Sequence, residues 1–251
     1  MEAGARPLDG RSRAGAMDGL GRGRERSAAP GGQLVPVGAG NGRGGVEERP
    51  DMERQEKLEA LRAYVRRLKR AVIAFSGGVD STFLAALAAE VLGEGVVVAT
   101  AVSPLHPARE REQALGQAAA LGLRHLILPT RELEREEFVQ NSPQRCYYCK
   151  RWFLARLVEV AAALGAGGVL DGTNADDARD FRPGTEAAKE LGVLSPLREL
   201  GWTKREIRAA ARELGLAVWD RPSTACLASR FPYGERITPS KLLMVEQAEA
   251  F

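Results

Sequence analysis

Residues 71–81 read AVIAFSGGVDS, and this stretch decides the fold of the chain. An apolar run, Val72–Phe75, leads directly into Ser76-Gly77-Gly78, and residues 81–92 (STFLAALAAEVL) then follow a helical pattern. A short apolar run bounded by glycines is typical of a buried strand, whereas the longer segment is typical of a helix. The stretch therefore predicts a strand, a tight glycine-rich loop and a helix in direct succession.

The sequence that follows repeats this alternation. We expect further buried strands at residues 96–102, 125–128 and 168–171, and helices at residues 109–121 and 149–164. Continuous apolar strands that alternate with helices are typical of an α/β fold, in which helices cover both faces of a parallel sheet. Ligands of such sheets bind beyond the carboxyl ends of the strands. We therefore expect the site near Ser76, Ser103 and Asp171-Gly172, where three of the strands end.

The loop Ser76–Ser81 has the composition of a phosphate-binding loop. Its glycines let backbone N–H groups approach an anion, the following helix presents free N–H groups, and Ser76 and Ser81 add hydroxyl donors. A carboxylate at Asp80 suits such a loop only if a divalent cation accompanies the phosphates. The Walker spacing is absent, which excludes a P-loop NTPase. The structural alternative is a plain strand–helix turn with an Asp-Ser cap.

Three cysteines form a second candidate site. Cys146 and Cys149 are spaced i, i+3 at the start of a helix, so both lie on one face. We expect the helix dipole, Arg145 and Lys150 to lower the pKa of these thiols. Two thiolates on one helix and a third at Cys226 suit an iron–sulfur cluster with one iron left open. The alternatives are a redox pair, half of a zinc site, or three buried structural cysteines.

Composition excludes several classes of protein. The chain has 251 residues, and its 36 Lys+Arg against 33 Asp+Glu give a net charge of only +3, too balanced for a dedicated nucleic-acid binder. No apolar run approaches the roughly 20 residues of a membrane span. Three cysteines are too few for a disulfide framework and indicate reduced thiols, hence a cytoplasmic location. We expect neither nucleic acid nor membrane as a partner.

The two ends of the sequence differ from its centre. Residues 1–51 are rich in glycine and arginine without apolar periodicity, which predicts a disordered extension, either a natural tail or sequence upstream of a true start at Met52. We expect a nucleotide-binding domain over residues 52–220. Residues 221–251 would hold the Cys226 loop and the start of a C-terminal region that the chain does not complete.

Several motifs resemble known families. The loop SGGVDS resembles the signature of the PP-loop ATP pyrophosphatases, which cleave ATP between its α- and β-phosphates. A further set of motifs resembles the LarE family of ATP-dependent sulfur transferases over nearly 200 residues. Those motifs are RCYYCK (Arg145–Lys150), DGTNADD (Asp171–Asp177), DFRPG (Asp180–Gly184) and ACLASRFPYGERIT (Ala225–Thr238).

The resemblance implies a reaction. ATP, with Mg²⁺, adenylates a carboxylate of pyridinium-3,5-biscarboxylic acid mononucleotide, and sulfur then displaces AMP to give a thiocarboxylate for the nickel-pincer nucleotide cofactor. Relatives with three cysteines are implied to use a 4Fe-4S cluster that an external sulfur source reloads, whereas relatives with one cysteine sacrifice the sulfur at the position of Cys226. All three cysteines are present, which favours the cluster. The resemblance also implies a homo-oligomer.

The same resemblance suggests further site residues. Ser76, Gly77, Gly78, Val79, Asp80 and Ser81 would bind ATP, and Asp80, Cys226, Ser229 and Arg230 would carry the chemistry. Asp171, Asn174, Asp176 and Asp177 follow a strand end and suit Mg²⁺ or a nucleotide, or simply an Asx-rich turn. Glu246 and Glu249 lie where the family carries a metal-binding carboxylate. The alternative functions are a PP-loop tRNA thiolase with an iron–sulfur cluster and an ATP-dependent amide synthetase of the NAD or GMP synthetase type.

Overall fold

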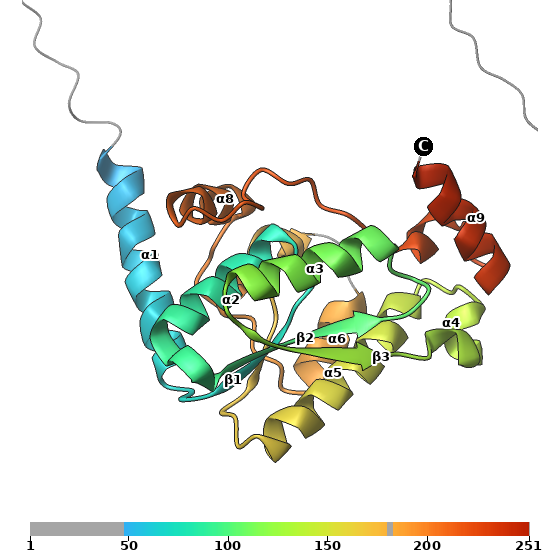
Figure 1. Cartoon of the computed structure of the whole chain (residues 1–251), viewed down its shortest axis with the longest axis horizontal. Coiled ribbons are helices and arrows are strands. Elements are labelled where there is room, and N and C mark those ends of the chain that lie inside the picture. Colours follow the sequence, from blue (N-terminus) through green and yellow to red (C-terminus); the bar gives the residue numbers. More distant parts are fainter. Residues whose placement is uncertain (1–47, 180–182, 251) are drawn as a thin grey trace, which may run out of the picture. The chain divides into compact units, whose positions relative to one another are not determined.

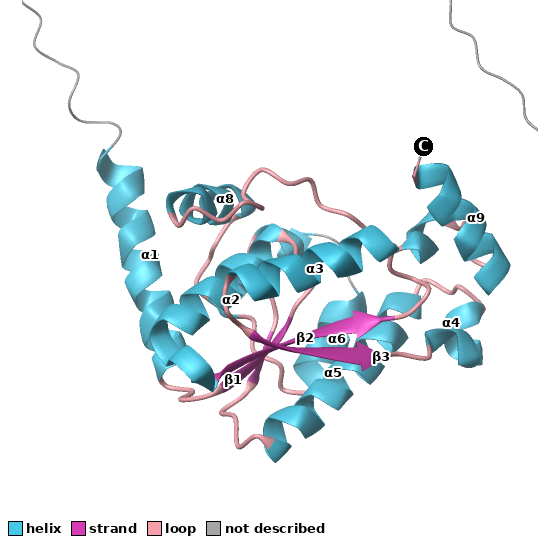
Figure 2. Cartoon of the chain, in the orientation of Figure 1, coloured by secondary structure: helices cyan, strands magenta, loops and turns pink. Residues whose placement is uncertain are grey.

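The computed structural model describes residues 48–179 and 183–250. The expectations for residues 1–47, and for the part of the DFRPG motif at residues 180–182, lie outside the described residues. The strands are β1 (Ala71–Ala74), β2 (Val96–Val102), β3 (Arg124–Pro129) and β4 (Val169–Leu170). They form one parallel sheet in the order β3-β2-β1-β4 (Figures 1 and 2).

The helices connect these strands and extend the chain beyond them. The α-helices are α1 (Glu48–Arg66), α2 (Val79–Leu92), α3 (Ala108–Ala120), α4 (Glu136–Val139), α5 (Arg145–Ala163), α6 (Pro183–Glu190), α7 (Pro196–Glu199), α8 (Lys204–Glu213) and α9 (Pro239–Glu249). The 3₁₀ helices are η1 (Gly93–Gly95), η2 (Glu132–Glu134), η3 (Asp176–Arg179) and η4 (Leu227–Arg230). The predicted parallel α/β fold is confirmed, and each expected strand and helix lies within a few residues of its prediction.

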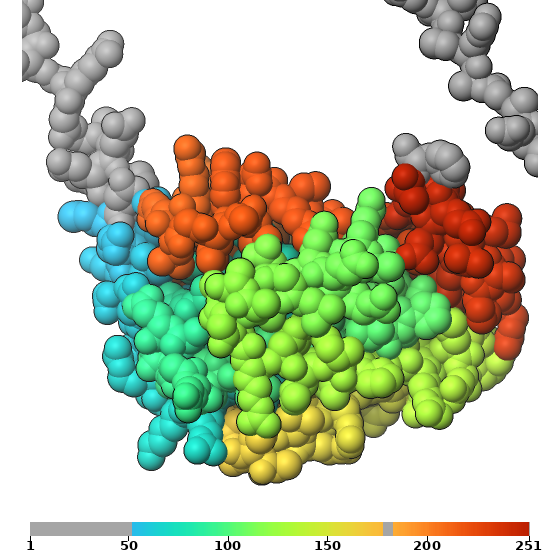
Figure 3. Space-filling view, viewed as in Figure 1, coloured from blue at the N-terminus to red at the C-terminus, as the bar shows by residue number. Residues whose placement is uncertain are grey.

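Alternate residues of the central strand β1 pack against different layers. Ala71 and Ile73 join a cluster that includes α1, α2, α3 and α8, whereas Val72 joins a cluster with α5 and α6. This alternation follows from the two-residue period of a strand, and the burial of both sides explains why β1 is apolar throughout. In Figure 3 the side chains of α3 (green) lie between those of α8 (orange) and those of α9 (red).

A third apolar cluster lies in segments that follow the carboxyl ends of β2 and β3. It contains Leu105 from the β2–α3 loop, Phe138 from α4, Leu227 from η4 and Leu242 from α9, and Cys149, Trp152 and Cys226 pack against it. This cluster joins the C-terminal segment to the segments that leave the sheet. Cys149 and Cys226 are therefore placed at the edge of the sheet where a ligand is expected.

Candidate active site

The predicted phosphate loop connects β1 to α2. The loop folds onto itself through its serines: the Ser76 and Ser81 hydroxyl oxygens lie 3.1 Å apart, and the Gly78 N–H donates to Ser76 Oγ at 3.3 Å. Gly78 is the N-cap of α2 and offers no side chain to the first turn of the helix. The N–H groups of that turn therefore have no capping side chain, as an anion site requires.

Two glycines confine the loop. Gly77 has φ +71°, and a Cβ added there would lie 2.7 Å from the Ala114 Cα of α3. A Cβ added at Gly172, just after β4, would lie 3.0 Å from the Ser81 nitrogen. Side chains at either position would push neighbouring backbone away, so the loop is held between α3 and the turn after β4.

Asp80 occupies the first turn of α2. Its Oδ2 forms an ion pair with the ammonium of Lys204, and its buried Oδ1 has no hydrogen-bond partner. Burial raises the pKa of Asp80, and Lys204 opposes that rise. A buried carboxylate oxygen without a partner is costly unless a ligand completes it. The arrangement fits the predicted role of Asp80 toward a divalent cation.

The turn after β4 lies against the same loop. Asn174 Oδ1 accepts the N–H groups of Asp176 and Asp177, and Asp177 Oδ2 accepts the Asn174 N–H at 3.0 Å. Asp176 Oδ2 accepts the backbone N–H of Lys204 at 2.7 Å. These are contacts of an Asx-rich turn, the structural alternative. The Asn174 side chain and the charge of Asp177 nevertheless also act on Asp80, so the turn borders the predicted nucleotide site.

Asp171 is buried at the carboxyl end of β4. Its carboxylate accepts the hydroxyls of Thr173 and Ser195, each at 2.7 Å, and the ammonium of Lys150 lies 3.7 Å away. The carboxylate is thus already satisfied by hydroxyl groups, which favours a role in shaping the turn. Because Lys150 belongs to α5, this ion pair links Asp171 to the helix that begins with the cysteine pair.

The fold brings the three cysteines into one electrostatic neighbourhood. Cys146 is exposed on the first turn of α5, whereas Cys149 and Cys226 are partly buried. Cys226 and Cys146 both raise the pKa of Cys149, and Cys146 raises that of Cys226. The Leu227 N–H donates to the Leu105 carbonyl at 2.9 Å, which fixes the Cys226 segment beside the end of β2. The sequence separated these thiols, and the fold unites them.

The expected lowering of the thiol pKa is wrong for Cys149, and the pKa of Cys226, for which no such expectation was made, is raised as well. Burial is the largest cause in both, and it raises both pKa values. The buried carboxylate of Glu132 raises the pKa of Cys149 further. Lys150 does not compensate because its ammonium lies beside Asp171, and Arg145 only partly offsets the effect of burial on Cys226. Helix-start position and neighbouring basic residues were outweighed by desolvation.

Among residues 48–179 and 183–250, no three His, Cys, Asp or Glu side chains are arranged to hold a single metal ion. The ligands of an iron–sulfur cluster bind different iron atoms and stand further apart than the ligands of one ion. Three soft thiol donors from two segments match the donor set of such a cluster: Cys149 and Cys226 pack against one apolar cluster, and Cys146 is exposed one turn earlier on α5. The residues present therefore fit the group that the sequence suggested.

Ser229 and Arg230 lie in η4, directly after Cys226. Arg230 Nε donates to Glu249 Oε1 of α9 at 2.5 Å, and its Nη1 donates to Ser229 Oγ at 2.6 Å. Glu246 accepts the Ala108 N–H at 2.9 Å. The two glutamates of α9 thus bind the start of α3 and the arginine beside Cys226.

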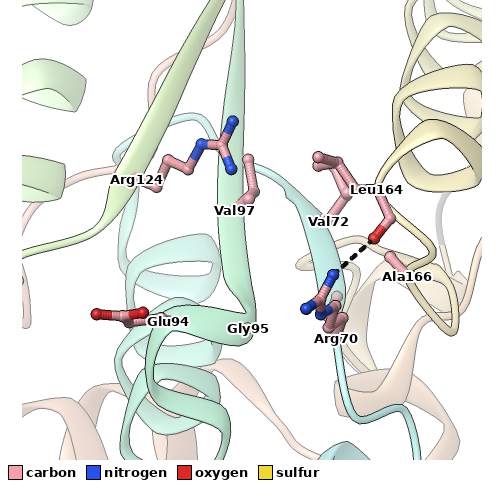
Figure 4. A pocket seen from close by; sticks show the side chains of 9 residues that line it. Arg70, Val72, Glu94, Gly95, Val97, Arg124, Leu164 and Ala166 are labelled. Atoms are coloured by element: carbon pink, nitrogen blue, oxygen red, sulfur yellow. Dashed lines mark hydrogen bonds between the residues drawn. The ribbon is translucent and has the colours of Figure 1, made fainter.

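A small cavity of about 130 Å³ lies at the opposite edge of the sheet, where the strands begin (Figure 4). Arg70, Glu94 and Arg124 line it, and Arg70 donates to the Leu164 carbonyl at 3.2 Å. Because the phosphate loop and the cysteines follow the carboxyl ends of the strands, this cavity is separate from the candidate site.

Known proteins with similar sequences point the same way as this geometry. The NAD synthase family model matches residues 53–153. An uncharacterised protein of Synechocystis is 48% identical over 78% of this chain and 74% of its own length. The pyridinium-3,5-bisthiocarboxylic acid mononucleotide synthase of Lactiplantibacillus plantarum is 37% identical over 78% of this chain and 71% of its own length. The chain belongs to the LarE family of ATP-dependent sulfur transferases.

This LarE-family chain is also similar, at lower identity, to part of a longer protein. A GMP synthase of Aeropyrum pernix is 30% identical over 72% of the chain but only 38% of its own length. The family model and the mononucleotide synthase confirm the predicted family and enzyme class, and the parallel sheet confirms the predicted α/β fold. None of the helices in the described residues is long and apolar enough to cross a membrane.

Sequence reasoning missed three residues that contact the candidate site. Lys204 contacts Asp80, Glu132 contacts Cys149, and Asn141 binds the Cys226 segment. A signal existed for Glu132, because it follows the end of β3 and the carboxyl edge was the expected ligand edge. Lys204 and Asn141 gave no such signal, since nothing local relates them to their distant partners.

Proposed function

We propose that the chain adenylates a carboxylate of pyridinium-3,5-biscarboxylic acid mononucleotide with ATP and Mg²⁺, and then converts the acyl-adenylate to a thiocarboxylate. In the first step a carboxylate oxygen attacks the α-phosphorus of ATP, and pyrophosphate leaves with the bonding electron pair. In the second step sulfur attacks the carbonyl carbon, and AMP leaves. The observation that carries the proposal is the pairing of an uncapped phosphate loop with Asp80, whose buried Oδ1 lacks a partner.

The residues of the loop suit the first step. The N–H groups at the start of α2 and the hydroxyls of Ser76 and Ser81 would hold phosphate oxygens, and Asp80 would hold Mg²⁺. Once Mg²⁺ takes the place of the Lys204 ammonium beside Asp80, Lys204 would turn toward the phosphates. The phosphates, like Asp80, are anionic and can bind the ammonium. Positive charge would then lie beside the departing pyrophosphate and stabilise it.

The three cysteines suit the second step. When bound to Cys146, Cys149 and Cys226, a 4Fe-4S cluster would supply a renewable sulfide, so that the chain need not break a cysteine C–S bond. Cys149 and Cys226 would lose their protons on binding iron, because thiolates are the ligands. The apolar packing around Cys149 and Cys226 would keep water from the sulfur site. Ser229 and Arg230, three and four positions after Cys226, would orient the anionic substrate if Arg230 released Glu249.

Two measurements on anaerobically reconstituted protein test the proposal. We expect pyrophosphate release that depends on the mononucleotide, and about four iron and four sulfide per chain that disappear in Cys226→Ala. Pyrophosphate release that does not require the mononucleotide would contradict the proposed substrate. Absence of iron, with a mass loss equal to one H₂S after turnover, would replace the cluster by sacrifice of Cys226.

The remaining expectations are proposals about the setting of the enzyme. A reducing compartment such as the cytoplasm suits the three free thiols. An external sulfur donor would reload the cluster, and homo-oligomerisation is proposed from the family alone. The division into residues 1–51, 52–220 and 221–251 likewise stays a prediction.

A further inference from the structure

Glu132 is a buried acid that the proposed reaction does not use. It begins η2, three residues after β3 ends, and its side chain is 2% exposed. One carboxylate oxygen, Oε2, is buried without a hydrogen-bond partner. Asp171, the other fully buried acid of the described residues, instead accepts hydrogen bonds from Thr173 and Ser195. Glu132 therefore lacks the compensation that burial of a carboxyl group requires.

The other oxygen of Glu132 faces the sulfur site. Cys149 Sγ donates to Glu132 Oε1 at 3.7 Å, the weak contact expected of a thiol. Leu133, the next residue, packs against the apolar cluster that holds Cys149 and Cys226. Burial lowers the pKa of His106, the nearby basic group that senses Glu132, which leaves that ring neutral at pH 7. The carboxyl group thus accepts the Cys149 thiol through one oxygen, while its other oxygen is buried without a partner.

The two oxygens of this carboxyl group are therefore unequal, because Oε1 accepts the Cys149 thiol whereas the buried Oε2 has no hydrogen-bond partner. A cation bound beside Cys149 would complete the oxygen that has no partner. Iron accepts carboxylate oxygen as well as thiolate ligands.

We propose that Glu132 is the fourth protein ligand of the cluster, binding through its carboxylate the iron that no cysteine holds. This inference rests on the proposed cluster. Hydrosulfide from the external donor would displace Glu132 when sulfur is loaded: an Fe–S bond forms, the Fe–O bond breaks, the iron keeps its oxidation state, and the carboxylate leaves as an anion. Glu132 would thus close the reactive iron whenever no sulfur is bound to it.

The test compares the reconstituted full chain with E132Q and E134Q. E132Q keeps the shape of the side chain but removes its charge, and Glu134 is the exposed acid of the same 3₁₀ helix. We expect all three to hold about four iron. In E132Q the Mössbauer signal of the distinct iron changes, and sodium sulfide binds about tenfold more tightly or better. E134Q behaves as the wild type.

A measurement on the wild type does not depend on how E132Q folds. In chain labelled with ¹³C at the glutamate carboxyl carbons, electron–nuclear double resonance of the reduced cluster should show one strongly coupled carbon. Absence of that coupling overturns the proposal, and so does unchanged sulfide binding in a folded E132Q. Loss of all iron from E132Q also overturns it, because the substitution would then act through Cys149. A wild type without iron overturns the proposed cluster itself, and intact pyrophosphate release then separates that result from failure of the adenylation proposal.

Discussion

The ammonium of Lys204 and the carboxylate of Asp80 form an ion pair across 124 positions of sequence, joining the first residue of α8 to the first turn of α2. Lys204 is held there by its helix: Thr203 and Glu206 form a capping box at the start of α8, and Asp176 accepts the Lys204 N–H. The cation of this pair stands where the proposed mechanism needs Mg²⁺. Predictions about the nucleotide site therefore begin with these two residues.

Replacing Asp80 by Asn should lower the rate of pyrophosphate release about 100-fold or more, because the amide cannot replace the carboxylate as a ligand of Mg²⁺. The measurement is pyrophosphate release at saturating ATP and mononucleotide. Glu90→Gln, on the exposed side of α2, is the matched control. Iron content should not change in either variant, and normal release by Asp80→Asn would refute the assigned role.

Replacing Lys204 by Gln should raise the KM for ATP about tenfold, which corresponds to about 1.4 kcal/mol. The variant loses a phosphate-binding charge, and it also leaves Asp80 without its ion-pair partner, so the pKa of Asp80 rises further. Initial rates as a function of ATP concentration measure the effect. Arg205→Gln removes the neighbouring exposed charge and should change nothing. Equal KM values for both variants would place Lys204 outside the site.

Replacing Cys146 or Cys149 by Ser should remove the iron while pyrophosphate release continues, since the adenylation residues lie on other segments. Iron and acid-labile sulfide assays, with the visible spectrum, report the first effect. The pyrophosphate assay on the same samples reports the second. Retention of full iron content by both variants would exclude these cysteines as ligands.

Replacing Asn141 by Ala should destabilise the chain by about 2–4 kcal/mol. Asn141 is fully buried with φ +54°, its Nδ2 donates to the Pro232 carbonyl at 2.7 Å, and its own carbonyl accepts the Gly234 N–H. The substitution removes the side-chain amide, so the Pro232 carbonyl and the buried Arg145 guanidinium lose a hydrogen-bond partner, and it places alanine in a left-handed conformation. Urea unfolding measures the loss, with the exposed neighbour Gln140→Ala as control. A change below about 0.5 kcal/mol would show that the contacts contribute little.

Acidification should destabilise the protein through His106. Burial lowers the pKa of His106 from its ordinary 6.5, so the unfolded chain binds a proton more readily than the folded chain does. Stability is therefore full above about pH 6.5 and falls as pH decreases, by at most about 1.4 kcal/mol per unit for one proton. Urea unfolding from pH 7 to 5 should show a shallower decline in His106→Gln than in the wild type or Arg109→Gln. Parallel curves would contradict this prediction.

Much of the fold followed from local pattern. The strands are apolar because β1 and β2 are covered on both sides, and Gly77 of the loop marks a place where Ala114 leaves no space for a side chain. The edge strand β3 is less buried, yet its apolar pattern was still sufficient to predict a strand there. Such features depend on neighbours in sequence, so sequence alone predicts them.

The electrostatics of the site did not follow in the same way. Proximity in sequence assigned Lys150 to the cysteines, but its ammonium lies beside Asp171. Glu132 is only 17 positions from Cys149, yet its effect on that thiol depends on burial, which results from packing of the whole layer. A pKa is set by desolvation and three-dimensional neighbours, and neither can be read from spacing.

The third apolar cluster has a consequence for access to the enzyme. The segment with Cys226 is fastened by few backbone hydrogen bonds, among them Leu227 N–H to Leu105 and Ile237 N–H to Val139, and none of them belongs to the sheet. Local opening of this layer can therefore occur while β1 and β2 stay paired. We expect the amides of Leu227 and Ile237 to exchange with deuterium well before those of Ile73 and Val98, so that Cys226 can become accessible while the strands that carry the phosphate loop stay folded.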